Sequence, residues 1–388
     1  MVMRKRKIIF TTGIRSDFYI QSPVMQAVQE HRNLECLVII TGAHLSKRFG
    51  NTVNEVEKNN YNIVAKINNL VLSDRLSSRV EGAAVQLRKI IKVFEKVKPD
   101  IVVAPFDREE AITVALAGVY MNIPVAHLGA GDKTRVNVDG IIRHSVSKLS
   151  HILFTSTREN AERIIKMGEE KWRVFNVGHA GLDRYRKTPH LTREEISSYL
   201  GLDINSKPLI VLIQHPVSNE INRSGKQISV TLSALDKLNY PTVIIYPNSD
   251  PGRNIMVSAI KEYNFKNEQI KRVKNIPELY FVNLMRYADV LVGNSSMGVL
   301  EAPMLKLPVV NVGMRQMDRE HAENIIFVPH NESEIRGAVE KCLYDERFKE
   351  RVNKSSNPYG KGLSGEKIAN ILSKIKIDDR LLNKQITY

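Results

Sequence analysis

The chain has 388 residues, of which 43% are hydrophobic and only 6% aromatic, enough for ordinary globular cores and, at this length, for two domains. Its 57 basic and 42 acidic residues give a formal net charge of +15, so the field around the protein should attract anions. We expect a phosphorylated small molecule as partner, no membrane and no nucleic acid, because no apolar run of about 18 residues occurs and basic residues do not interleave with aromatic ones.

Short apolar, often β-branched runs alternate with segments of helical period in the first half of the chain. The predicted strands are Lys7–Thr12, Glu35–Thr41, Asn62–Ile67, Ile101–Pro105, Val125–Leu128, Ile152–Thr155 and Arg173–Val177. The predicted helices include Arg75–Lys96, Glu109–Met121, Ile141–Leu149 and Asn160–Met167. Such alternation is typical of βαβ units, so residues 1–180 are predicted to form a Rossmann-like domain with a parallel sheet.

A polar, turn-rich stretch then interrupts the alternation, and we interpret residues 181–206 as a linker. It contains a short helix with a capping box at Thr192 and Glu195. Alternation resumes with strands predicted at Pro208–Gln214, Thr242–Tyr246, Gln269–Lys274, Val290–Val292, Val309–Val312 and Ile325–Val328, and helices near 226–238, 254–263, 277–287 and 332–344. Residues 207–362 are thus predicted as a second Rossmann-like, nucleotide-binding domain. The fold class is α/β, with two doubly wound domains facing a cleft.

The start of the chain and its cysteines limit location and cofactors. The first ten residues, MVMRKRKIIF, lack the apolar core and cleavage site of a signal peptide, so we expect a cytoplasmic protein. Cys36 and Cys342 show neither CxxC nor His spacing, which argues against a disulfide framework and a zinc site. We predict no metal and no cofactor.

Small and polar residues follow nearly every predicted strand. In open parallel sheets, ligands bind beyond the carboxyl ends of the strands. Here the strands lead into TGIRSD, TGAHLS, FDREE and HLGAGDKT, and later into QHPVSNE, PNSDPG, GNSSMG and VGMRQMDR. Two such sets of donor-rich loops predict one anionic ligand held between two domains.

The segment VLVGNSSMGVLEAP passes from the strand at Val290–Val292 directly into a predicted helix at Met297–Leu305. The unpaired N–H groups and the positive dipole end of a helix N-terminus attract anions. A serine N-cap on an ordinary helix is the alternative, and this segment alone does not decide between them.

Eight segments in this order resemble the UDP-N-acetylglucosamine 2-epimerases. They are TGIRSDF, TGAHLS, DGIIRHSVSKLSH, RIIKMGEEKWRVFNVGHAGLD, QHPVSNE, PNSDPG, GNSSMGVLEAP and LPVVNVGMRQMDRE. The last two are most similar to the hydrolysing branch, which makes N-acetylmannosamine for sialic-acid-type sugars. The resemblance implies a GT-B-like fold, a UDP-linked sugar as substrate, and a homodimer. It also implies that residues 363–388 hold a helix, at Gly365–Lys374, that crosses back to the first domain, followed by a tail.

The resemblance also assigns roles in substrate binding. GNSSMG becomes a diphosphate cradle, in which Ser295, Ser296 and the N–H groups before Gly298 hold the β-phosphate, while Glu301 binds the ribose. Guanidinium groups match phosphate bidentately, which favours Arg15 and Arg315 as partners of the diphosphate. For each of these arginines a surface salt bridge is the alternative. The further residues predicted to bind the substrate are Gly13, His44, Arg143, Asn248 and Asn294.

The implied reaction eliminates UDP across C1 and C2 to give a glycal, to which water adds with inversion at C2. Removal of the C2 proton needs a carboxylate base, for which Asp107 is the first candidate; it could instead cap the helix starting at Glu109. Asp139, which Arg143 could orient, matches a second acidic position, again with a helix cap as the alternative. His215 matches a histidine that contacts phosphate or sugar and could neutralise the leaving group.

The sequence departs from the family after the fifth strand. Where the family has a glutamate in HxEGGE or HxEAG, this chain has Gly129, and the next acidic position is Asp132, the fourth catalytic candidate. Phe106 replaces the glycine of the family's GDR motif, and its apolar ring would suit a deoxygenated sugar such as a 2,4-diacetamido-trideoxyhexose. A glycosyltransferase on the same scaffold and a catalytically impaired nucleotide-sugar-binding protein remain alternatives.

Overall fold

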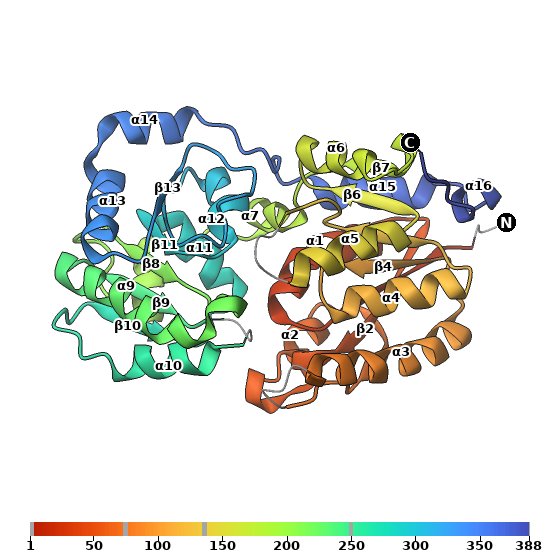
Figure 1. The fold of residues 1–388 in the computed structure, drawn as a ribbon, viewed down its shortest axis with the longest axis horizontal. Helices are drawn as coiled ribbons and strands as arrows, with labels where there is room; N and C mark the ends of the chain where they lie inside the picture. The colour runs from red at the N-terminus through yellow and green to blue at the C-terminus, as the bar shows by residue number, and fades with distance from the viewer. Residues whose placement is uncertain (1–3, 73–76, 134–137, 248–250, 388) are drawn as a thin grey trace. The chain divides into compact units, whose positions relative to one another are not determined.

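The structure is a computed structural model that describes residues 4–72, 77–133, 138–247 and 251–387 (Figure 1). The chain divides into two compact units. The first comprises Met1–Asp132, Val138–Arg184 and Tyr359–Tyr388, and the second comprises Lys133–Asn137 and Tyr185–Pro358. The predicted α/β class with two parallel sheets is confirmed.

The first unit contains a seven-stranded sheet in the order β3-β2-β1-β4-β5-β6-β7, and all of its strand pairs are parallel. Because the order reverses between β1 and β4, the switch point of the sheet lies between these two strands. The strands are β1 (Arg6–Thr12), β2 (Leu34–Thr41), β3 (Asn62–Ile67), β4 (Ile101–Pro105), β5 (Val125–Leu128), β6 (Ile152–Thr155) and β7 (Val174–Asn176).

Helices cover both faces of this sheet, so its central strands are continuous apolar runs instead of alternating patterns. Alternate residues of β1 belong to different cores: Ile8 and Phe10 pack with α1 and α15, and Ile9 packs with α3 and α4. The helices are α1 (Arg15–Glu30), α2 (Val53–Glu57), α3 (Ser77–Val97), α4 (Glu109–Tyr120), α5 (Val138–Leu149), α6 (Arg158–Lys166), α15 (Ser364–Lys374) and α16 (Asp379–Leu382), with α7 (Asp183–Lys187) at the boundary of the units.

The helix predicted at Gly365–Lys374 is α15, which packs against α1 in the first unit. A Cβ on Gly365 would lie 2.6 Å from the carbonyl oxygen of Pro23, so glycine permits the close approach of these helices. The carboxylate of Asp183 accepts hydrogen bonds from the backbone N–H groups of Ser364 (3.0 Å) and Gly365 (2.7 Å) and thereby caps α15.

The residues after α16 fold back onto the end of α5. Lys384 Nζ donates to the carbonyl oxygens of Ser147, Lys148 and Ser150 at 3.1, 2.7 and 2.8 Å. It also lies 2.6 Å from Oε2 of Glu169, a fully buried carboxylate whose Oε1 is 2.8 Å from Lys148 Nζ. Lys384 thus caps α5 and neutralises a buried charge.

Lys384→Met should lower the free energy of unfolding by about 3 kcal/mol, because it leaves Glu169 buried with one cation instead of two. Urea unfolding followed by circular dichroism measures the change. Lys376→Met, at an exposed position nearby, is the matched control and should change stability by less than about 0.5 kcal/mol. Equal losses in the two variants would contradict this role of Lys384.

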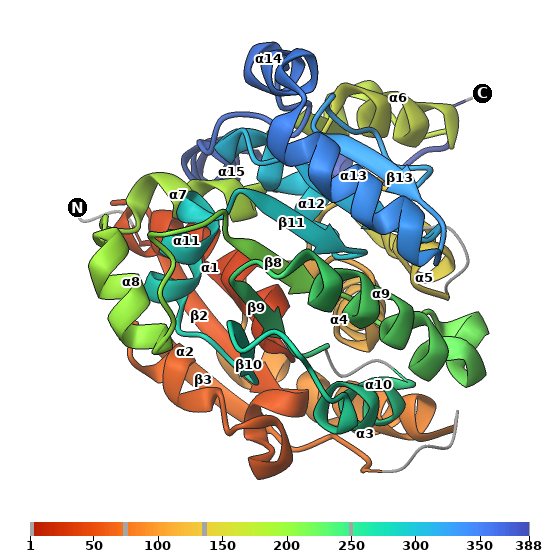
Figure 2. The same cartoon turned by 90° about the vertical axis from the view of Figure 1, so that its left-hand side faces the viewer.

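The second unit contains a six-stranded parallel sheet in the order β10-β9-β8-β11-β12-β13, with its switch point between β8 and β11; the labels from β10 to β11 follow one another in Figure 2. The strands are β8 (Ile210–Ile213), β9 (Thr242–Ile245), β10 (Ile270–Val273), β11 (Val290–Gly293), β12 (Val309–Val312) and β13 (Ile325–Val328). The helices are α8 (Arg193–Leu200), α9 (Ser224–Leu238), α10 (Arg253–Glu262), α11 (Glu278–Tyr287), α12 (Met297–Leu300), α13 (Glu332–Tyr344) and α14 (Glu346–Lys354).

Most of the segment predicted as a linker is part of the second unit. The capping box of Thr192 and Glu195 is present at the start of α8. Ile196 and Leu200 of this helix are buried in the core beneath one face of the second sheet. Although residues 181–206 are polar in composition, the short helix predicted there contributes to the core of the second unit.

The helix predicted at Met297–Leu305 is wrong in its second half. α12 ends at Leu300, and a separate 3-10 helix runs from Ala302 to Leu305. Pro303 has no N–H to donate and its ring would clash with the carbonyl one turn earlier, which disfavours continuation of the α-helix.

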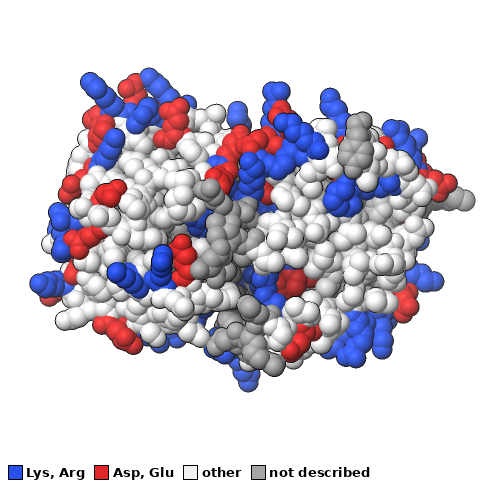
Figure 3. All heavy atoms as spheres, in the orientation of Figure 1, with Lys and Arg blue, Asp and Glu red and all other residues white. Residues whose placement is uncertain are grey.

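Lys and Arg are interspersed with Asp and Glu over the face drawn in Figure 3, without a single continuous basic stripe there. Among the described residues, no helix is long and apolar enough to cross a membrane.

Candidate functional site

In the first unit, a buried arginine joins two carboxylates at the ends of neighbouring strands. Arg143 of α5 is only 5% exposed, and its Nη1 donates to Oδ2 of Asp132 at 2.7 Å. Its Nη2 donates to Oδ2 of Asp107. Asp107 follows β4 and Asp132 follows β5, so the guanidinium brings together two predicted catalytic residues from separate loops. The helix-cap alternative for Asp107 is not what this structure shows, because the N-cap of α4 is Arg108.

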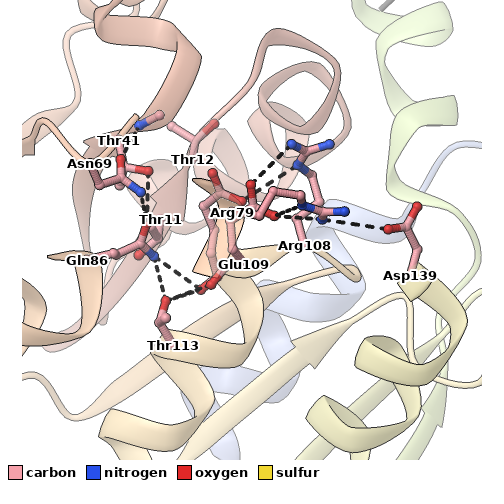
Figure 4. Close-up of polar contacts among 12 residues, drawn as sticks. Thr11, Thr12, Thr41, Asn69, Arg79, Gln86, Arg108, Glu109, Thr113 and Asp139 are labelled. Carbon is pink, nitrogen blue, oxygen red and sulfur yellow. Dashed lines mark hydrogen bonds and ion pairs between the residues drawn. The ribbon is translucent and has the colours of Figure 1, made fainter. Parts of the chain in front are cut away.

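Asp139 has a different environment. It lies in the first turn of α5, and its Oδ1 is 3.8 Å from Nη2 of Arg79. The same Nη2 is 2.7 Å from Oε2 of Glu109, so Arg79 lies between two carboxylates (Figure 4). The predicted partner Arg143 is bound to Asp107 and Asp132, two acids that the sequence did not pair with it.

Glu110, which the sequence did not single out, is buried at the switch point. A Cβ on Gly13, directly after β1, would lie 1.8 Å from Oε1 of Glu110, so a larger residue there would displace the Glu110 carboxyl group. Glu110 is 2% exposed, and its Oε2 has no hydrogen-bond partner among the described residues, although Arg108 Nε is 3.7 Å away. Burial, reinforced by Glu109, raises the pKa of Glu110 to about 7 against the effect of Arg108. A carboxyl group of this kind both accepts and donates protons near neutral pH.

The raised pKa of Glu110 makes the stability of the first unit depend on pH. Between pH 4.5 and 7 the folded protein binds more protons at this group than the unfolded chain does, so stability falls as pH rises through this window. Glu110→Gln removes this loss. The free energy of unfolding of Glu110→Gln minus that of the original protein should be roughly 2 kcal/mol larger at pH 8 than at pH 5.

The neighbouring carboxylate supplies a control that should show almost no pH dependence between pH 5 and pH 8. Burial raises the pKa of Glu109, but Arg108 and Arg79 outweigh it and hold the pKa below its ordinary value. Both pH 5 and pH 8 lie above the folded and unfolded pKa values of this group, so Glu109→Gln should lose about the same stability at the two pH values. Urea unfolding of both variants at the two pH values is the measurement; a Glu110→Gln protein with unchanged pH dependence would contradict the assignment.

His44, predicted to bind substrate, is fully buried. Its Nε2 is 3.0 Å from the hydroxyl of Thr12, and its Nδ1 is 2.8 Å from that of Thr52. Burial lowers the pKa of His44 to about 4, so the ring is neutral at pH 7. Both nitrogens are thus used within the protein, and the ring joins β1 to the loop before α2.

Arg15, at the start of α1, is paired with a carboxylate. Its Nε donates to Oε2 of Glu55 at 2.9 Å, and its guanidinium lies 5.2 Å from the centre of the Tyr19 ring. The Tyr19 hydroxyl donates to the same oxygen of Glu55 at 2.6 Å. Any phosphate bound by Arg15 would compete with Glu55.

In the second unit, Asn294 joins the ends of β8 and β11. Its Oδ1 accepts from the backbone N–H of His215 at 2.7 Å, and its Nδ2 donates to the carbonyl of the same residue at 2.9 Å. Gly293 before it has φ 125°, and a Cβ there would lie 2.2 Å from the carbonyl oxygen of Ile213. Asn294, 2% exposed, therefore positions the loop that carries His215.

The loop after β12 converges on the same residue. Arg315 Nη1 and Gln316 Nε2 donate to the carbonyl oxygen of Asn294 at 3.1 and 3.0 Å. The predicted Arg315 thus lies beside the GNSS loop, together with Gln316, which the sequence did not single out. Ser295 Oγ accepts from the N–H of Met297 at 3.3 Å.

The remaining predicted residues surround this loop. Ser296 is the N-cap of α12, and a Cβ on Gly298 would lie 2.8 Å from Cγ1 of Val309, so glycine lets this short helix pack on β12. Glu301 is 5% exposed and accepts from the hydroxyl of Tyr185 at 2.8 Å. Asn248 lies outside the described residues. The described part of the chain has no cluster of three His, Cys, Asp or Glu that could hold a metal ion.

Two α/β units, each with a sheet of parallel strands and with polar and charged residues at the strand ends, define a GT-B-like protein. The fold resembles a solved Neisseria meningitidis UDP-GlcNAc 2-epimerase bound to UDP-GlcNAc, with a TM-score of 0.82, 20% identity, and coverage of 95% of this chain and 100% of that one. A Methanocaldococcus jannaschii UDP-GlcNAc 2-epimerase in complex with UDP-GlcNAc and UDP gives a TM-score of 0.72 at 22% identity, over 95% and 99% of the two chains.

The family follows from the sequence. The pattern of the family described as UDP-N-acetylglucosamine 2-epimerase matches residues 26–373, and the chain belongs to this family. The UDP-N,N'-diacetylbacillosamine 2-epimerase (hydrolyzing) of Legionella pneumophila is 33% identical over 99% of this chain and 100% of that protein. The GDP/UDP-N,N'-diacetylbacillosamine 2-epimerase (hydrolyzing) of Campylobacter jejuni is 33% identical over 90% of each chain. The predicted resemblance to the hydrolysing branch is confirmed.

Proposed function

We propose that this enzyme is a hydrolysing 2-epimerase acting on a UDP-linked 2,4-diacetamido sugar of the N,N'-diacetylbacillosamine type. The names of the two relatives at 33% identity support this sugar. The observation that carries the proposal is the pairing of Asp107 and Asp132 on Arg143. It provides a second carboxylate beside Asp107 although Gly129 replaces the expected glutamate.

Inversion at C2 explains why two carboxylates are needed. In the first step Asp107 takes the C2 proton, the C1–O bond breaks, and UDP leaves with the bonding electrons, which gives a glycal. In the second step the oxygen of water bonds to C1, and C2 receives a proton from a carboxylic acid on the opposite face. The proton that water releases restores that acid, and Asp107 gives its proton to solvent. We assign the proton transfer at C2 in this step to Asp132, because one carboxylate cannot reach both faces.

The second unit supplies the diphosphate site in this proposal. Ser295, Ser296 and Arg315 bind the departing diphosphate, Glu301 binds the ribose, and His215 stabilises the developing negative charge. The contacts of Asn294 with His215 and Arg315 support this arrangement, because they hold the loops after β8, β11 and β12 together. We further propose that the protein is cytoplasmic and forms a homodimer. Light scattering on the purified protein tests the dimer.

The decisive experiment incubates the protein with UDP-N,N'-diacetylbacillosamine and, separately, with UDP-N-acetylglucosamine. UDP release is followed, and the free sugar is identified by NMR. UDP together with the 2-epimer of the diacetamido sugar establishes the proposal. Release of UDP with unchanged configuration at C2 would rule out epimerisation, and thermal stabilisation by UDP without turnover would identify a binding protein. Asp107→Asn is the inactive control.

A further inference from the structure

Two residues in the left-handed region of backbone space meet at the ends of β4 and β5. Phe106 has φ 53°, which is uncommon for an aromatic residue, and Gly129 has φ 79°. A Cβ built on Gly129 would lie 3.0 Å from Cδ1 and 3.6 Å from Cε1 of the Phe106 ring. The ring therefore occupies the space that a larger side chain at position 129 would need, so Phe106 and Gly129 form a matched pair.

The surrounding structure holds Phe106 in this conformation. Its N–H donates to the carbonyl oxygen of Leu128 at 3.0 Å, and its carbonyl oxygen is 2.7 Å from Nε2 of His127. A carbonyl oxygen can only accept, so Nε2 carries the proton of this ring. The Nδ1 of His127, which is fully buried, is 3.0 Å from the hydroxyl of Ser147 in α5. Strained residues that the surrounding structure fixes in this way are enriched at functional sites.

The position of the pair indicates what the ring does. Phe106 directly precedes Asp107, and Gly129 lies three residues before Asp132, so the ring is attached to the same two loops as the carboxylates that meet on Arg143. Phe106 is half-buried: it packs against the core that contains Leu128 and leaves part of its surface open. A partly exposed apolar ring is therefore present on the loops that carry the two proposed catalytic groups.

We propose that Phe106, with Gly129 making room for it, is an apolar wall of the sugar site that selects sugars lacking free hydroxyls at C4 and C6. This inference rests on the proposed function. A hydroxyl against the ring would lose its water without gaining a partner, whereas a methyl or acetamido methyl group gains contact. A difference of one such group in an apolar pocket changes kcat/KM by about 10 to 200-fold.

The test compares kcat/KM for UDP-N,N'-diacetylbacillosamine and UDP-N-acetylglucosamine in the original protein, Phe106→Gly, Gly129→Glu and the double variant. Phe106→Gly should reduce the preference for the diacetamido sugar by about tenfold or more. The ratio of the two substrates cancels any general damage to the catalytic loop. Lys98→Gly is the matched control: Lys98 has φ 52° at the other end of β4, so its replacement relieves similar backbone strain and should leave the ratio unchanged.

The double variant tests the shared space. Gly129→Glu alone should unfold at a markedly lower temperature, and removal of the Phe106 ring should restore a large part of that loss. An unchanged substrate ratio in Phe106→Gly, or a Gly129→Glu loss independent of Phe106, would overturn the inference while leaving the epimerase proposal intact. If neither sugar is turned over, the proposed function fails, and the ratio of the two dissociation constants, measured calorimetrically in the same variants, still decides the role of the wall.

Discussion

Replacing Arg143 by methionine should lower kcat by at least about 1,000-fold and reduce the free energy of unfolding by about 3–5 kcal/mol. The loss in stability arises because Asp107 and Asp132, with side chains only 16% and 10% exposed, would face each other without the shared guanidinium. The loss in activity arises because their mutual repulsion would displace both proposed proton-transferring groups. UDP release under saturating substrate and urea unfolding measure the two effects.

Two further variants separate charge from geometry. Arg143→Lys keeps the cation but lacks the planar fork that reaches two carboxylates, so it should recover stability better than activity. Arg158→Met removes an arginine whose side chain is 89% exposed and pairs with Glu162, and it should change stability by less than about 0.5 kcal/mol. If Arg143→Met were as active as Arg158→Met, Asp107 and Asp132 would not be the catalytic pair.

The sheets could be predicted from the sequence because parallel strands buried on both faces are short, uninterrupted apolar runs. Most predicted strands end within one residue of the observed ends, and β3, β4, β5, β6, β12 and β13 agree at both ends. The largest difference is at β8, where the predicted residues Pro208, Leu209 and Gln214 lie outside the observed strand.

Proline limited the prediction of helices in both directions. α1 was not among the predicted helices, and Pro23 in its middle normally argues against a continuous helix. Tertiary packing overrides that signal, because α1 buries Phe18, Val24 and Val28 against the sheet. At Pro303 the same residue type did end the helix, since α12 has only one turn with which to oppose the break.

The residues of the candidate site could be named from motifs, but their partners could not. Asn294 was predicted as a substrate ligand, which stays a prediction; the structure adds that its side chain joins two strand ends. Glu110 reads as an ordinary acidic residue in the first turn of a helix. Its contact with Gly13 arises only because β1 and β4 are neighbours in the sheet, which no local pattern reveals.

Replacing Gly293 by alanine should destabilise the second unit by about 4 kcal/mol or more and abolish its binding of UDP. The added Cβ would lie 2.2 Å from the carbonyl oxygen of Ile213 and 3.1 Å from the backbone nitrogen of Gln214, atoms that cannot move without separating β8 from β11. The backbone at φ 125° is also one that alanine rarely adopts. Differential scanning calorimetry should show a transition about 10 °C lower or more.

Gly337→Ala is the matched control for this variant. Gly337 lies within α13, and a Cβ there would meet no atom within 4 Å. This change should therefore stabilise the protein by about 0.5–1 kcal/mol, because alanine favours the helix and restricts the unfolded chain. If Gly293→Ala lowers stability and Gly337→Ala raises it, residue 293 is glycine because the strands approach closely there. A Gly293→Ala protein that unfolds at the original temperature and still binds UDP would show that the loop has another conformation in solution.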